Sequence, residues 1–222
     1  MSYVKLYITL RVISYDGATN RNQLIADAAN LEADRPKERF PVVTLVLYFG
    51  HKHHWRKCLN LLSCFDTPKE LKPFVNDYRI NLFEIAWLSE EEVKMFQSDF
   101  RVVADYFVQM RKNRGYVPSK ETITHVHEVL QLMSVVTDDN RFEEVQNYVE
   151  RSGSNMCEVL DAIENRGIEK DQLRTAVNTL KRYIRRQLPI DAQVLEDIAE
   201  DNELTVEKVR SIAKENGISL SC

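Results

Sequence analysis

The chain has 222 residues and a mass of 25.9 kDa, enough for one sizeable domain or a domain with a helical appendage. Hydrophobic residues make up 44% of it and charged residues 29%, a composition that excludes wholesale disorder. The net charge of −4 excludes a protein that is basic overall, so a surface for nucleic acid must be a local patch.

The longest strongly apolar run, Val42 to Phe49, is far shorter than the roughly 20 residues that a membrane-spanning helix needs, so we expect no membrane partner. No secretory signal is visible at the N-terminus. The cysteines are few, and we expect reduced thiols in a cytoplasmic protein; they are Cys58, Cys64, Cys157 and Cys222.

Charge is distributed unevenly along the chain. Residues 1–115 carry 17 basic and 14 acidic side chains, whereas residues 116–165 carry 3 and 10. The segment from Arg166 to Leu188 holds seven basic and two acidic residues, and the segment from Pro189 to Cys222 holds three and eight. Such blocks are typical of solvated faces or of docking surfaces for a partner segment.

The first half of the chain predicts a helix and two strands. The apolar spacing of residues 5–33 favours a helix, with Asp16-Gly17 as a candidate interruption and Arg35-Pro36 as its end. Residues 41–50 form the clearest strand, and because it is apolar on both faces we expect a central strand covered by helices on each side. A short helix is expected at Leu59–Leu62. The period-two alternation of residues 78–85 indicates a second strand.

From Ser98 onward the pattern is helical. Ser98 resembles an N-cap, and Pro118-Ser119 is expected to open a second helix. Two further helices are indicated by apolar positions near Phe142 and near Met156, the latter reaching Gly167. We expect three parts: an α/β domain at 1–115, a helical extension at 116–166 and a helical tail at 167–222.

The tail holds two patterns that suggest partners. Its apolar positions from Leu173 to Leu188 are spaced 4, 3, 4 and 4, a coiled-coil-like seam that would serve self-association or packing within the same domain; they are Leu173, Val177, Leu180, Ile184 and Leu188. Residues 191–216 have helix-turn-helix spacing, with Lys208, Arg210 and Lys214 able to meet phosphate. The acids of this segment repel DNA, so plain helical packing is the alternative.

Candidate chemical sites are weak. The acid-x-lysine pattern of many magnesium nucleases occurs at Glu70-Leu-Lys72 and Glu92-Val-Lys94, but neither lies in an expected strand, so surface charge is the favoured interpretation. The histidines at 51, 53 and 54, with Cys58 beyond, include zinc-ligand types without paired ligand spacing, and a polar loop explains them equally well. No nucleophile elbow or Gly-rich phosphate loop is present.

Several stretches together resemble one family, the bacterial putative transposases of the PD-(D/E)XK nuclease superfamily, known as the recombination-promoting nuclease (Rpn, YhgA-like) group. The resemblance covers roughly residues 8–165 in matching order. It rests on residues 10–18 with Arg21 and Gln23-Leu24, residues 41–50 with Trp55, residues 68–73 and 76–82, residues 98–106, and residues 155–161.

The resemblance implies a partial PD-(D/E)XK, restriction-endonuclease-like α/β core, followed by a helical bundle and a helical tail. The family implies magnesium-dependent cleavage of DNA in recombination and mobile elements, with a metal-binding aspartate and a Glu-x-Gln or Glu-x-Lys pair on an early hairpin. Only Met1 to Thr9 precede Leu10, and they contain no acid. We therefore expect a chain that lacks the catalytic hairpin, holds no metal or cofactor and is inactive alone.

The same resemblance places Arg11, Tyr15 and Gln23 on the helix that follows the catalytic hairpin. We expect them to contact phosphate or support the site, the alternative being a helix that packs on the sheet with these residues outward. DNA is one expected partner, and a second copy or a full-length paralogue is another. The alternative function is a non-catalytic regulator of a full-length family nuclease, bound through the helical regions.

Overall fold

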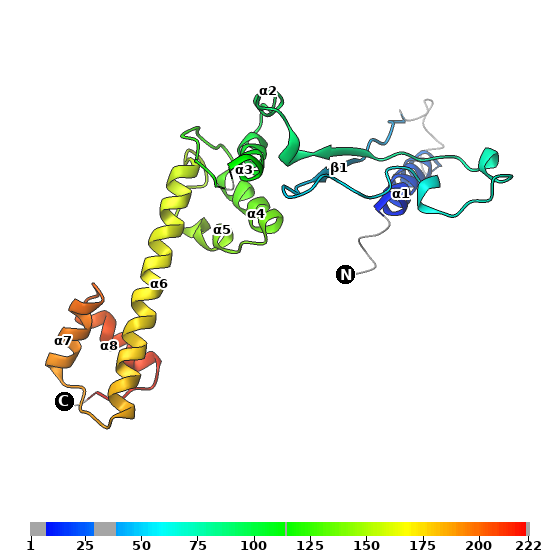
Figure 1. Cartoon of the computed structure of the whole chain (residues 1–222). Coiled ribbons are helices and arrows are strands. Elements are labelled where there is room, and N and C mark those ends of the chain that lie inside the picture. The colour runs from blue at the N-terminus through cyan, green and yellow to red at the C-terminus, as the bar shows by residue number, and fades with distance from the viewer. Residues whose placement is uncertain (1–7, 29–38, 114, 221–222) are drawn as a thin grey trace. The chain divides into compact units, whose positions relative to one another are not determined.

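The computed structural model describes residues 8–28, 39–113 and 115–220. The chain divides into two compact units between Val117 and Pro118, which we call unit 1 and unit 2. The described residues are mostly helical, with one two-stranded parallel sheet in unit 1 (Figure 1).

Unit 1 begins with helix α1, Ile8–Ala28. Asp16-Gly17 does not interrupt it, because the buried Asp16 carboxylate accepts hydrogen bonds from the hydroxyls of Thr44 and Tyr78 and so fixes the middle of the helix to the segments beside the sheet. The remaining residues of the predicted helix, and the end predicted at Arg35-Pro36, lie outside the described residues.

The sheet pairs β1, Leu45–Tyr48, with β2, Asn81–Glu84, in parallel, and Leu47 lies opposite Phe83. Both strands were predicted, but the prediction that the first strand is buried on both faces was wrong. Leu45 is 54% exposed and Leu47 is 44% exposed, because the described part of the chain supplies no layer over this face. The other face is half-buried and carries the polar links to α1.

Short elements follow each strand. The 3-10 turns η2, Leu62–Cys64, and η3, Lys72–Phe74, lie between β1 and β2, so the expected short helix at 59–62 is a single turn displaced toward its C-terminus. After β2 come η4, Ile85–Trp87, and α2, Glu90–Lys94. Ser89 and Glu92 form a reciprocal capping box that begins α2.

Helix α3, Phe100–Asn113, carries the core of unit 1. The helix expected from Ser98 onward is confirmed, and its residues Val103, Ala104 and Phe107 are buried where it packs against η4. Phe107 also contacts Phe49, with ring centroids 5.0 Å apart. The carboxyl ends of β1 and β2 are thereby fixed to one side of α3.

Unit 2 opens with an extended segment and then α4, Val126–Thr137, α5, Arg141–Glu144, and η5, Val145–Asn147. The prediction that a helix begins at Pro118-Ser119 was wrong. Ile123 instead exchanges backbone hydrogen bonds with Gly153 and Ser154, and its fully buried side chain completes the core from outside the helix.

Helix α6, Met156–Arg185, joins two predicted helices into one of 30 residues. Asn155 and Glu158 form the capping box that begins it. Gly167 does not end the helix, and its Cα faces open space. The boundary expected at 166–167 therefore falls inside a continuous helix.

The tail helices are confirmed. Helix α7, Ala192–Asp201, and helix α8, Val206–Glu215, are N-capped by the side chains of Asp191 and Thr205. Both helices pack on the C-terminal half of α6 (Figure 1). The predicted seam is used within this unit, since Leu180 is fully buried among residues of α7 and α8 while Ile184 and Leu188 remain exposed.

Candidate functional site

The residues predicted to support a site, Arg11, Tyr15 and Gln23, do not converge. Arg11 Nη2 donates to the Tyr15 hydroxyl at 2.9 Å on the exposed side of α1. Gln23 has a structural role: its amide donates to the Phe40 carbonyl at 3.0 Å and accepts from the Phe40 amide at 2.8 Å. Arg11 and Tyr15 thus form one exposed pair, and Gln23 holds the chain that leads to β1.

A denser set of functional groups follows β1. Residues 51–57, His-Lys-His-His-Trp-Arg-Lys, combine three cations and three histidines, and no acid occurs between Gly50 and Phe65. We call residues 51–57 the basic loop. Lys52 and Arg56 are exposed, and Lys57 lies over the Trp55 ring at 5.7 Å. Aromatic rings interleaved with cations are typical of surfaces that bind nucleic acid.

The basic loop is held against the segment after β2. The His54 ring stacks on the Trp87 indole with centroids 3.4 Å apart, and the Trp87 Nε1 donates to the Gly50 carbonyl at 3.1 Å. Glu84, at the end of β2, accepts from the Trp55 amide at 2.6 Å and lies 3.2 Å from His54 Nδ1. The middle of the loop is therefore ordered by contacts with the carboxyl ends of both strands.

Helix α3 supplies the opposite wall. Arg111 donates from Nε to the Ala86 carbonyl at 2.6 Å, and its guanidinium lies 4.9 Å from the Trp87 ring centroid. These contacts fix the arginine at the carboxyl end of α3, where a cation is also favoured by the helix dipole. Lys112, next to it, pairs with Glu90 and holds the pKa of that carboxyl below its usual range.

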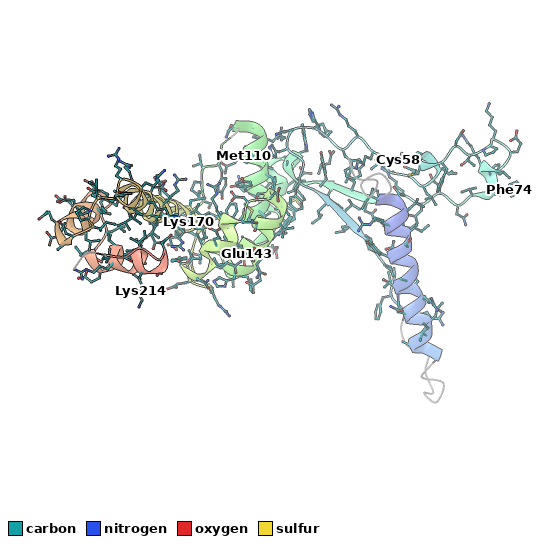
Figure 2. The ribbon with its side chains drawn as sticks, turned by 90° about the horizontal axis from the view of Figure 1, so that it is seen from below. Cys58, Phe74, Met110, Glu143, Lys170 and Lys214 are labelled. Carbon is teal, nitrogen blue, oxygen red and sulfur yellow. The ribbon has the colours of Figure 1, made fainter. Side chains whose placement is uncertain are left out.

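Between these walls lies a cavity of about 550 Å³, lined by His51, Lys52, His53, Met110 and Arg111. Figure 2 shows Met110 on α3. Among the residues that the structure describes, the lining holds two permanent cations and two imidazoles and no carboxylate. A lysine and an arginine that line one cavity are suited to the oxygens of a phosphate group. We call this space the cationic cavity.

The metal sites considered from sequence gain no support. Within residues 8–28, 39–113 and 115–220, no three His, Cys, Asp or Glu side chains gather to hold a metal ion. Glu92 caps α2, and Glu70 lies in a turn, so neither acid-x-lysine pair lies on a strand. The described residues therefore do not fit the magnesium site that the resemblance implies, and no step through a metal follows from them.

Three residues at or beside the cationic cavity were not identified from the sequence as part of a site. Met110 and Arg111 were assigned only to a predicted helix, and Trp87 to no element. A signal for the loop was present, because three cations and a tryptophan fall within seven residues. The sequence does not show that α3 ends beside it.

The helix-turn-helix-like tail exposes the three predicted cations, Lys208, Arg210 and Lys214, on α8. Figure 2 shows Lys214 directed away from the rest of the tail. Glu207 and Glu215 are exposed on the same helix, so its outer surface is of mixed charge. The tail therefore attracts phosphate less strongly by electrostatics than the basic loop does.

Comparison with known proteins gives no relative: no family model, no curated protein and no solved structure matches the chain. Among the described helices, none is both long and apolar enough to cross a membrane.

Proposed function

We propose that the chain is a non-catalytic DNA-binding protein similar to the PD-(D/E)XK putative transposases, and that it contacts the phosphates of double-stranded DNA at the cationic cavity. The observation that carries this proposal is the convergence of Lys52 from the basic loop and Arg111 from α3 on one cavity, with no acid among the described residues that line it. A polyanion is the ligand class that such a lining favours.

The surroundings of the cavity also favour the binding of a polyanion. Unit 1 carries 17 basic and 14 acidic residues, so its net charge is opposite to that of DNA. Two carboxylates that follow or end β2 are engaged, since Glu84 is bound by the basic loop and Glu90 by Lys112. Trp87 and His54 hold the loop in place before any ligand arrives, which lowers the entropic cost of binding.

No hydrolytic role is assigned to residues of this chain. The buried carboxylate of Asp16, on α1, accepts hydrogen bonds from Thr44 and Tyr78 and joins the helix to the sheet. We expect incubation of plasmid DNA with Mg²⁺ or Mn²⁺ to leave it uncut. Robust cleavage that a chelator abolishes would overturn the non-catalytic part of the proposal.

Binding is tested by fluorescence anisotropy of a labelled duplex at about 50 and about 200 mM salt. We expect Lys52→Gln to weaken binding and to reduce the slope of log K against log salt by about one. Lys69→Gln, an exposed lysine elsewhere in unit 1, is the matched control. Equal binding by both variants, or tighter binding to RNA than to DNA, would contradict the proposal.

A second candidate function is supported by the uncovered sheet. Val43, Leu45, Leu47 and Phe83 are 44–68% exposed, and in the parallel register they share one face. An exposed apolar sheet with open edges favours pairing with another chain. The exposed sheet therefore supports the second candidate function, a regulator that binds a full-length nuclease of the resembled family. The proposed contact is the sheet and not the helical seam.

Co-purification with such a nuclease tests the second candidate. Leu47→Asp places a charge on the exposed face and is expected to abolish capture. Val135→Asp, at an 80% exposed position on α4, is the control that should keep it. Failure of the unsubstituted chain to capture a full-length relative would remove this candidate without affecting DNA binding.

A further inference from the structure

Two exposed sets of opposite charge lie on neighbouring helices of unit 2. The basic set, at the carboxyl end of α6, consists of Lys181, Arg182, Arg185 and Arg186. The acidic set, on α7, consists of Glu196, Asp197, Glu200 and Asp201. Both follow the spacing i, i+1, i+4 and i+5, so each forms a single patch on its helix that spans fewer than two turns.

Neither set is neutralised within the part of the chain that the structure describes. The other cations of α6 are paired, Arg166 with Glu169, Lys170 with Glu144 and Arg174 with Asp171. No ion pair there joins the basic set to a carboxylate or the acidic set to a cation. Asp197 accepts a hydrogen bond from the neutral amide of Gln193.

Local helix chemistry does not account for the two sets. Cations at the end of α6 suit the helix dipole, but Glu200 and Asp201 lie at the carboxyl end of α7, where the dipole disfavours acids. Residues four apart also carry like charges within each set, which destabilises a helix. Contact with a patch of opposite charge would relieve both unfavourable interactions.

We propose that these sets form the interface of a homodimer, in which the basic set of each copy lies against the acidic set of the other. The identical spacing of the two sets allows the basic set of one copy to match the acidic set of the second along its whole length. A two-fold axis makes both contacts at once, as most soluble homodimers do. The inference rests on unit 2 and is independent of DNA binding at unit 1.

Two observations favour a second copy over a nucleic acid. Residues 118–222 carry 13 basic and 20 acidic side chains, so this unit as a whole repels a polyanion. Apolar surface also adjoins the basic set, where Ile184 is 46% and Leu188 is 48% exposed. A cavity of about 390 Å³ lined by Lys181, Ile184 and Arg185 opens here, and it can receive a side chain of the opposing helix.

The test is sedimentation velocity of the full chain at about 0.1 M and about 1 M salt. We expect a dimer at low salt that dissociates at high salt. Two fourfold variants are needed, one changing every residue of the basic set to Glu and the other changing every residue of the acidic set to Lys. Each should be monomeric alone, because its two patches then carry the same charge.

Mixing the two variants gives the decisive result. The first presents acidic patches on both helices and the second presents basic patches on both, so together they should form a heterodimer, which loss of folding cannot produce. Lys208→Glu with Arg210→Glu and Lys214→Glu, on α8, is the control that should stay dimeric. A monomeric unsubstituted chain at low salt, or no association in the mixture, would overturn the proposal. If the unsubstituted chain is a monomer and DNA binding is lost when the basic set is changed to Glu, the basic set is a surface for nucleic acid, and the proposal is again overturned.

Discussion

The imidazole of His54 lies stacked on the indole of Trp87, with ring centroids 3.4 Å apart and the ring planes inclined by 26°. His54 belongs to the loop after β1, and Trp87 ends the turn after β2, so this contact joins the carboxyl ends of the two strands. Arg111 lies over the same indole at 4.9 Å. Trp87 thus organises both the basic loop and the arginine of the cationic cavity.

We predict that Trp87→Ala weakens DNA binding although it removes no charge. Loss of the indole frees the basic loop and Arg111, so the cations must be ordered when DNA binds. The salt dependence of binding should remain close to that of the unsubstituted chain, because the number of cations is unchanged. Anisotropy titrations at several salt concentrations measure both quantities. Unchanged affinity would show that Trp87 does not position the site.

We predict that Asp16→Asn destabilises unit 1 by about 1–3 kcal/mol, because a buried carboxylate that accepts two hydroxyl hydrogen bonds is replaced by an amide. Urea unfolding followed by tryptophan fluorescence measures the change, since Trp55 and Trp87 both lie in this unit. Asp66→Asn, at an exposed position, should leave the free energy of unfolding within about 0.5 kcal/mol. Equal effects at the two positions would contradict the role of Asp16.

We predict a pH-dependent contribution from Asp139, which lies between α4 and α5. Its carboxylate accepts from Arg141 Nε at 2.9 Å, and these bonds lower the pKa of Asp139. Because the pKa is lowered on folding, the stabilisation is present above the unfolded value of about 3.9 and is lost as the pH falls through the folded value. Asp139→Asn should therefore cost about 1 kcal/mol at neutral pH.

Thermal unfolding of Asp139→Asn and of the unsubstituted chain, followed by circular dichroism between neutral pH and about pH 3, checks the sign. The difference should shrink as the solution becomes more acidic. Asp138→Asn is the control, since Asp138 has a φ of 58° that asparagine tolerates. A difference that grows toward low pH would contradict the prediction.

We predict that Leu180→Ala destabilises unit 2 by about 2–5 kcal/mol, because the side chain is fully buried and its removal leaves a cavity. Ile184→Ala, one turn further along α6 at a 46% exposed position, should cost about 1 kcal/mol or less. Urea unfolding followed by far-ultraviolet circular dichroism compares them. If the seam from Leu173 to Leu188 contacted only another chain, both substitutions would change the free energy of unfolding of the isolated monomer only slightly.

The tail was predictable from sequence because its signals are local. Asp191 and Thr205 are N-caps whose side chains reach the third residue of their helices, and the apolar residues repeat at helical spacing. The long helix α6 was divided in error at Gly167, since one glycine lowers helix propensity without ending a helix whose neighbours pack well.

The sheet and the site were less predictable because they depend on contacts between distant segments. Apolar residues at 41–50 indicate a strand, but their exposure depends on which layers cover it, and Leu45 and Leu47 have none among the described residues. Likewise the composition of the basic loop is local, whereas its pairing with Arg111 depends on where α3 ends. Helical periodicity alone could not place that arginine at the cavity.

The cationic cavity is the proposed contact with DNA. Hydrogen–deuterium exchange of the full chain, with and without a DNA duplex, tests it most directly because it locates the contact without any substitution. We expect slower exchange on DNA addition in residues 51–57 and in the last turn of α3, with little change in α7 and α8. Protection confined to α8, or no protection anywhere at saturating duplex, would contradict it.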